Sequence, residues 1–134
     1  MTLRRDFLRT TLAGLAVSLA PLPAALRAEE LRVLKQGSFS GRSAHVTTGS
    51  AAITEQDGRH FVSLGHDFSF DGAPDPKVAL GRDGYDGDTI LGPLQSNAGA
   101  QTYALPEGFN PADYNEIWVW CERFDVPLGV ASIG

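Results

Sequence analysis

The fold is decided by the stretch from Asn115 to Phe124, which has the sequence NEIWVWCERF. β-Branched and aromatic residues fill this stretch, as is typical of a β-strand. Side chains on a strand alternate between its two faces, and here the two rows are Ile117, Val119, Cys121 and Arg123, and Trp118, Trp120, Glu122 and Phe124. Both rows begin apolar. We therefore expect a strand that lies away from the sheet edges and is covered on both faces, at least from Ile117 to Trp120.

The rest of the chain is a succession of short β-prone runs separated by glycine, proline and aspartate. No run has a helical period over ten residues. Many short strands with turn residues about every ten positions are typical of an antiparallel sandwich or barrel. The sequence predicts an all-β fold, specifically a small antiparallel β-sandwich, with strands near residues 31–34, 44–48, 51–54, 61–64, 68–70, 78–80, 89–91, 102–105, 117–121 and 129–133.

Residues 1–28 have the pattern of a signal peptide. The chain begins MTLRRDFLR, with paired arginines at positions 4 and 5, and a mild apolar run over residues 12–22 ends in small residues up to Ala28. This run is shorter than the roughly 20 residues that a membrane span needs. The order of the residues around the arginine pair is that of a twin-arginine signal. We expect export by the twin-arginine route, removal of residues 1–28, a periplasmic or other extracytoplasmic location, and no membrane span afterwards.

Residues 29–134 are then one small domain. The net charge of the chain is −5, and because residues 1–28 contribute +3, residues 29–134 carry −8. Such an acidic domain is not expected to bind nucleic acid. The sequence contains one cysteine, so no internal disulfide is possible although the expected compartment is oxidising.

Cys121 is the candidate redox centre. It lies where the apolar part of its strand gives way to charged residues, so its sulfur is expected to be partly reachable from one side. Arg123, two residues further on the same row, would favour the thiolate. The alternative, that Cys121 is an inert cysteine filling a small core space, remains open.

The histidines are the other candidate ligands. His45 begins an alternating run and is the better partner for Cys121, whereas His60 and His66 lie next to turns and are expected to be solvated. Copper is less favoured than haem, because residues 29–134 contain no methionine for the axial position of a blue-copper site. The acidic loop at residues 83–88 lacks the glutamate of a calcium-binding EF-hand, and no hydrolase or phosphate-binding motif occurs.

A set of residues from Gly37 to Ala131 has a characteristic order and spacing. Its members are Gly37-x-Phe39, His45-x-x-x-Gly49-x-Ala51-x-Ile53, Leu64, Phe68, Gly72-Ala73-Pro74-Asp75, Val78, Leu80, Leu91-Gly92-x-Leu94, Gly99-x-Gln101-x-Tyr103-x-Leu105-Pro106, Tyr114, Trp120-Cys121-Glu122-x-Phe124, Gly129 and Ala131. In these residues the chain resembles the DM-thirteen domain, a small extracytoplasmic β domain described as an electron-transfer module. Only Pro76 stands where an apolar residue is expected.

The resemblance implies that Cys121 is the redox centre, as a bare thiol or as a ligand to a cofactor such as haem. In larger proteins the domain is associated with DOMON domains, which bind haem or sugars. The expected function is an exported electron-transfer or accessory redox protein rather than a hydrolase or transferase, with a redox protein or a small electron carrier as its partner. The alternative is a non-redox module that binds sugar or protein and has a structural cysteine.

Overall fold

The computed structural model describes residues 30–134, and the expected signal peptide lies outside this part of the chain. The described residues form ten strands, two short 3₁₀ turns and no α-helix. The elements are β1 Arg32–Gly41, β2 Thr47–Thr48, β3 Ser50–Gln56, β4 Arg59–Leu64, β5 Ser69–Phe70, β6 Pro76–Gly81, η1 Gly87–Thr89, β7 Gly92–Pro93, β8 Gln101–Ala104, η2 Pro111–Asp113, β9 Glu116–Cys121 and β10 Val126–Ser132. The predicted all-β class is confirmed.

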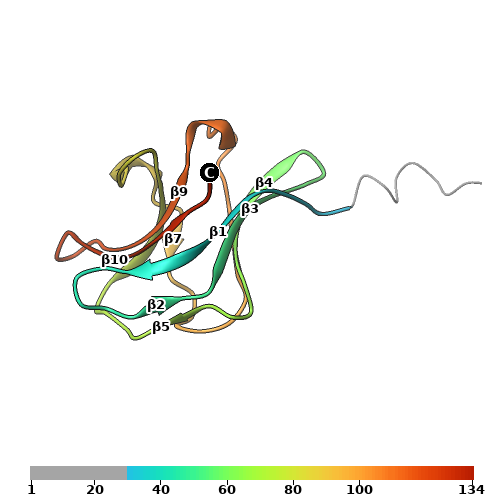
Figure 1. Cartoon of the computed structure of the whole chain (residues 1–134). Coiled ribbons are helices and arrows are strands. Elements are labelled where there is room, and N and C mark those ends of the chain that lie inside the picture. The colour runs from blue at the N-terminus through green and yellow to red at the C-terminus, as the bar shows by residue number, and fades with distance from the viewer. Residues whose placement is uncertain (1–29) are drawn as a thin grey trace, which may run out of the picture.

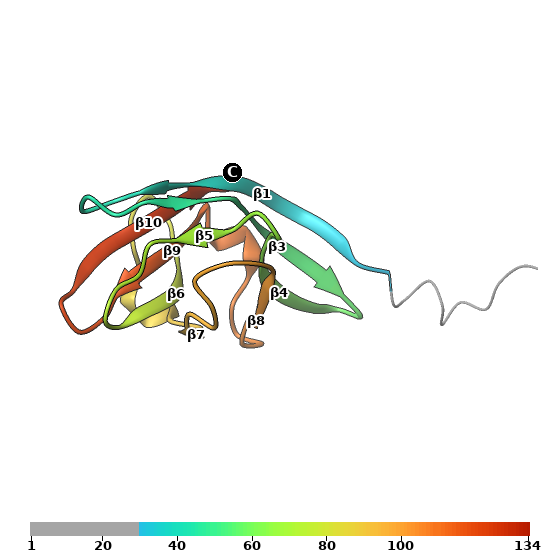
Figure 2. The ribbon, with the colours of Figure 1, turned by 90° about the horizontal axis from the view of Figure 1, so that it is seen from below.

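One antiparallel sheet of eight strands forms the body of the domain. Its strand order is β7-β6-β9-β10-β1-β3-β4-β8, and β2 and β5 pair separately. The sheet curls around the core until it is nearly closed like a barrel, an arrangement compatible with the predicted small sandwich (Figures 1 and 2). In Figure 2 the curve runs from β1 and β10 at the top to β7 and β8 at the bottom.

Hydrogen bonds from the loop after β7 to β8 link the two edge strands of the sheet. The backbone N–H of Gln95 donates to the Tyr103 hydroxyl at 2.9 Å, and its side-chain amide donates to the Thr102 carbonyl at 2.8 Å. The Tyr103 hydroxyl in turn donates to Gln101 Oε1 at 2.5 Å. Burial raises the pKa of Tyr103, so the phenol stays protonated and available as a donor.

β9 lies inside the sheet, as predicted. It pairs with β6 on one side, where Val119 faces Val78, and with β10 on the other. Ile117 and Val119 have no exposed surface, and their row points into the core. Trp118 and Trp120 are half-buried on the outer face. This face is covered by the loop after β6, described below.

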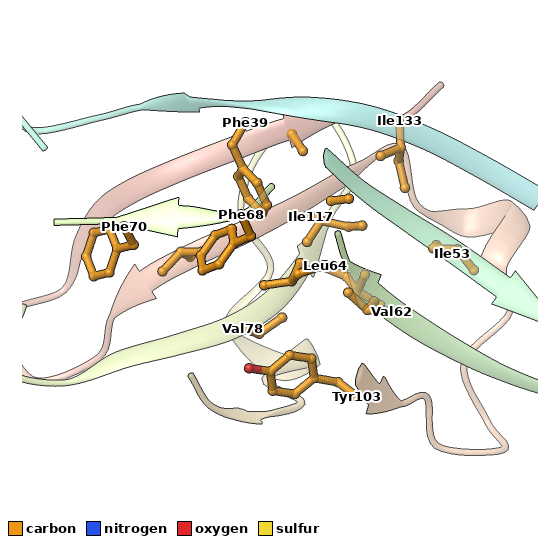
Figure 3. Close-up of a cluster of buried hydrophobic side chains, with 14 of the residues drawn as sticks. Phe39, Ile53, Val62, Leu64, Phe68, Phe70, Val78, Tyr103, Ile117 and Ile133 are labelled. Carbon is orange, nitrogen blue, oxygen red and sulfur yellow. The ribbon is translucent and has the colours of Figure 1, made fainter. Parts of the chain in front are cut away.

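The core is a continuous apolar cluster enclosed by the curled sheet. Figure 3 shows side chains from β1, β3, β4, β6, β8 and β9, together with Ile133 just after β10, converging with Phe68 and Phe70 from the β5 segment. Phe39 meets Phe68 edge to face, with 5.4 Å between the ring centroids. The small β2–β5 pair therefore closes one side of the core.

Several local expectations differ from the structure. β1 is longer than predicted, because its polar and glycine-containing half pairs with β3 and β10 and so gains partners on both sides. The strand predicted at residues 89–91 is wrong: Thr89 belongs to η1, and its buried hydroxyl bonds to both the N–H and the C=O of Leu80. β6 begins at Pro76, where a proline is tolerated because the first residue of a strand can lack a donor.

Candidate functional site

Cys121 is the last residue of β9. It faces Pro76 of β6 and Val126 of β10 across the two ladders. Its exposed fraction is 1%, and it belongs to the buried apolar cluster. The expectation that its sulfur is partly reachable is therefore wrong. The apolar pattern of β9 ends at this residue, but its side chain lies on the same face of the strand as Ile117 and Val119 and is buried in the apolar cluster.

The structure gives no strand geometry that would place Arg123 beside the thiol. β9 ends at Cys121, so the alternation of side chains ends there too, and residues 122–125 form a turn. Arg123 is exposed, and its backbone N–H donates to Asp75 Oδ2 at 3.1 Å. Stabilisation of the Cys121 thiolate by Arg123 stays a prediction, but the alternation of side chains on which it was based does not extend to Arg123.

A haem group does not fit at Cys121 as the core is packed. A thiolate that ligates haem iron needs an open face where the flat macrocycle can lie. Here the sulfur-bearing residue is 1% exposed and packs among the apolar side chains of the core. We derive no step through haem for this site.

His45 lies in the loop before β2 and not in a strand as predicted. Its Nδ1 is 2.8 Å from Asp71 Oδ1, and its ring lies 5.6 Å from that of Phe70. The Asp71 carboxylate also accepts from the Val46 N–H at 3.0 Å. Hydrogen bonds from Val46 and from His45 hold the pKa of Asp71 below its ordinary value. These partners fasten the loop to β5, and none of them comes from β9.

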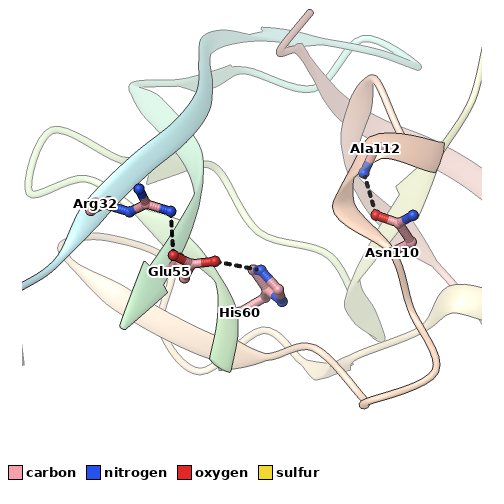
Figure 4. Close-up of polar contacts among 5 residues, drawn as sticks. All are labelled: Arg32, Glu55, His60, Asn110 and Ala112. Atoms are coloured by element: carbon pink, nitrogen blue, oxygen red, sulfur yellow. Dashed lines mark hydrogen bonds and ion pairs between the residues drawn. The ribbon is translucent and has the colours of Figure 1, made fainter. Parts of the chain in front are cut away.

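No three side chains of histidine, cysteine, aspartate or glutamate gather as a candidate metal site within residues 30–134. His66 is exposed, and His60 is half-buried with Nε2 at 3.2 Å from Glu55 Oε2. Glu55 also accepts a hydrogen bond from Arg32, as Figure 4 shows. This bond is the main reason why the pKa of Glu55 is lowered.

The outer face of β9 carries an aromatic cluster that we define as Tyr85, Trp118 and Trp120. The Tyr85 and Trp120 rings are stacked, with centroids 3.8 Å apart and planes 4° apart. Trp118 meets Trp120 edge to face at 5.7 Å and Tyr85 at 6.5 Å. The sequence identified both tryptophans but not Tyr85, because this residue comes from a loop distant from β9 along the chain.

A tight turn brings Tyr85 onto the tryptophans. Asp83 (φ 52°) and Gly84 (φ 142°) reverse the chain after β6, so that Tyr85 forms a bridge with Gly81. A Cβ atom at Gly81 would meet the Gly84 carbonyl oxygen at 2.2 Å and Trp118 Nε1 at 2.6 Å. Only glycine allows this approach. The sequence feature that points to the turn is the Asp83-Gly84 pair.

Carboxylates accept the hydrogen bonds of both indoles. Trp118 Nε1–H donates to Glu116 Oε1 at 3.1 Å, and Trp120 Nε1–H donates to Asp125 Oδ1 at 3.0 Å. Glu116 Oε1 also accepts from the Gly84 N–H at 2.7 Å. Asp125 lies in the exposed turn after β9. The two indoles therefore differ, since only the acceptor of Trp120 is exposed.

A cation lies among carboxylates at the same end of the sheet. Lys77 faces Trp120 in the ladder and has its Nζ 2.6 Å from Glu122 Oε1 and 3.0 Å from Asp75 Oδ1. Hydrogen bonds to Glu122 and Asp75 raise the pKa of Lys77. Burial raises the pKa of Tyr85, and the negative charges of nearby carboxylates, Glu122 foremost, add to the effect.

The described residues form an all-β domain with one cysteine at the buried end of the interior strand β9 and an aromatic cluster on the outer face of that strand. The chain belongs to the DM13 family: the family model described as "Electron transfer DM13" matches residues 38–133. No curated protein and no solved structure matches the chain. The family description supports a redox role and a redox partner. Residues 30–134 contain no helix long and apolar enough to cross a membrane.

Proposed function

We propose that this protein is an exported electron-transfer domain in which Cys121 is the redox-active group. Membership of the electron-transfer family supports the redox role. The observation that carries the choice of residue is the position of the single cysteine. It lies at the last residue of β9, directly before an exposed turn in which Phe124 is 59% exposed.

In this proposal the buried thiol is sheltered rather than open. A partner protein or a small electron carrier that reacts with the sulfur directly reaches it only when the end of the β9–β10 hairpin opens. Local openings of this kind cost less free energy than global unfolding. The register of the β9–β10 ladder shifts between Pro127 and Gly129, which supports the choice of this hairpin as the part that opens.

The place of action belongs to the same proposal. Paired arginines at positions 4 and 5 support export by the twin-arginine route to the periplasm or another extracytoplasmic space. Replacing both by lysine should leave the precursor in the cytoplasm, because a receptor recognises the arginine pair. Cell fractionation and immunoblotting locate the variant. Normal export would assign the protein to the general secretory route instead.

The test of the redox group is thiol–disulfide exchange between the purified domain and oxidised glutathione. In this step the Cys121 thiolate attacks the disulfide, forms a mixed disulfide and releases one reduced glutathione. Mass spectrometry should show this adduct in the wild type, its removal by an added dithiol, and no adduct in the Cys121→Ala variant. Val119→Ala is the matched control, because it removes buried apolar volume from the same row of β9 while keeping the thiol. The lack of an adduct in the folded wild type would reject this residue as the centre.

The burial of Cys121 also favours a second candidate, a non-redox binding module for sugar or protein with a structural cysteine. An open hollow of about 620 Å³ lies between the β3–β4 turn and the segment after β8, and Arg59, His60 and Phe109 contribute to its lining. Figure 4 shows His60 and Asn110 in this region. Saturable binding of a glycan or protein at this hollow, unchanged in Cys121→Ala, would favour the module.

A further inference from the structure

The rings of Tyr85 and Trp120 are closer together and more nearly parallel than those of most aromatic pairs in proteins. Most buried aromatic pairs meet edge to face or offset, with centroids 4.5–7 Å apart as a rough range. The two rings here lie 3.8 Å apart and within 4° of parallel. In such a stack, the π-electrons of one ring lie directly against the face of the other. A positive charge that forms on the indole is therefore stabilised by the electrons of the phenol.

The hydrogen bond of Trp120 adds a proton acceptor to this stack. Its indole N–H points to Asp125 Oδ1 at 3.0 Å. An indole that loses an electron becomes a strong acid at this N–H, and a carboxylate in hydrogen-bond contact can take the proton. Asp125 is exposed, so it exchanges that proton with water. Trp118 lacks this arrangement, because its acceptor Glu116 also binds the Gly84 N–H and its ring meets the others edge to face.

We propose that Trp120, stacked on Tyr85 and hydrogen-bonded to Asp125, is a one-electron redox site on the outer face of β9. It extends the proposed electron-transfer function by adding a second redox group, and its chemistry does not depend on Cys121. The partner is a cationic one-electron oxidant. In the step, the indole gives one electron to the oxidant and its N–H proton to the carboxylate. The products are a neutral indolyl radical, a carboxylic acid and the reduced oxidant, and a later electron from a reductant reverses the step.

The charges near the stack favour a cationic oxidant. Glu122 and Asp125 are exposed. Their negative charges, with that of Asp86, add to the rise in the pKa of Tyr85. The nearby cation, Lys77, is already paired with Glu122 and Asp75. Opposite charges raise the rate of encounter, and salt weakens this effect. Arg123 is also exposed at this end, so the attraction depends on the carboxylates closest to the rings.

The test is a flash-quench experiment on the full chain with tris(bipyridine)ruthenium as the cationic oxidant. Residues 1–28 contain no tryptophan or tyrosine, so both indoles belong to β9. Transient absorption should show a deprotonated indolyl radical in the wild type. Trp120→Phe should lose this signal and Trp118→Phe should keep it. The opposite pattern, or no radical in the wild type, would overturn the proposal.

Asp125→Asn provides the sharper readout. Asparagine tolerates the left-handed backbone of this position (φ 52°) and still offers an oxygen to the indole N–H, but it does not accept a proton. The radical should therefore appear first in its protonated form and lose the N–H proton to water more slowly than the wild type. An unchanged spectrum would show that Asp125 is not the acceptor and would overturn the assignment. Near-ultraviolet circular dichroism of each variant checks that the stack is retained.

The same experiment in a Cys121→Ala background separates the two proposals. The Trp120 radical should form with undiminished yield, because the thiol lies on the opposite face of β9. A radical that requires Cys121 would overturn the independent site while leaving the proposed cysteine function intact. A folded wild type that gives the Trp120 radical but forms no mixed disulfide with glutathione would overturn the cysteine function and leave the Trp120 site intact.

Discussion

Replacing Cys121 by serine should destabilise the domain more than replacing it by alanine, although serine is closer in volume. The residue is 1% exposed inside an apolar cluster. A serine hydroxyl placed there without a partner costs about 1–3 kcal/mol. Alanine removes one heavy atom and leaves a small cavity, which costs about 1 kcal/mol. For a domain near 100 residues, each kcal/mol lowers the unfolding midpoint by roughly 4–8 °C.

The assay is thermal unfolding under reducing conditions, followed by circular dichroism. Ala104→Ser serves as the matched control, because Ala104 is exposed on the edge strand β8 and should change stability by less than about 0.5 kcal/mol. Alkylation of Cys121 in the folded protein should be slow and should accelerate on unfolding. Equal midpoints for the serine variant and the wild type, together with rapid alkylation in the folded state, would refute the sheltered position of this thiol.

Two further outcomes follow from the packing and from the carboxylates. Gly81→Ala should lower the free energy of unfolding by about 1–3 kcal/mol and alter the near-ultraviolet spectrum of the tryptophans, since its Cβ would meet Trp118 Nε1 at 2.6 Å. Gly108→Ala, whose Cβ has nothing within 4 Å, is the control, and equal effects of the two would contradict the close approach. Hydrogen bonds are the main reason why the pKa values of Glu55, Asp67, Asp71 and Asp75 are lowered, and those to Asp67 come from the backbone N–H and the hydroxyl of Ser50. Their contribution to stability is therefore present above the ordinary carboxyl pKa of about 4 and is lost as the pH falls below it. Denaturant titrations from pH 6 to about pH 2 should show this loss, with a weaker slope in Asp67→Asn; a stability independent of pH over this range would count against the hydrogen bonds.

The position of β9 could be predicted from the sequence because both rows of its side chains are apolar and point to the same conclusion. Two apolar rows from Ile117 to Trp120 require cover on both faces, and only a strand inside the sheet obtains it. The twofold period also separated the buried row from the tryptophan row correctly. Local composition was a weaker guide for β1, where pairing on both sides outweighs the low strand propensity of glycine and serine.

The candidate site was harder to predict, because its geometry depends on residues distant in the chain. The environment of Cys121 is set by how far β6 and β10 extend, through Pro76 and Val126, and not by the charged residues that follow it. Tyr85 reaches Trp120 through two left-handed backbone positions in a loop. Periodicity describes neither effect, since both arise from tertiary packing and turn geometry.

The most direct test of the central claim is the oxidation state of Cys121 in the working protein. Cells of the native host are quenched in acid, which fixes the oxidation state of the thiol. The protein is then unfolded, so that the buried thiol can be alkylated, and is analysed by mass spectrometry. We predict both reduced and reversibly oxidised Cys121, in proportions that shift when oxidant or reductant is added to the cells. A thiol that stays fully reduced under every condition would contradict a redox role for Cys121.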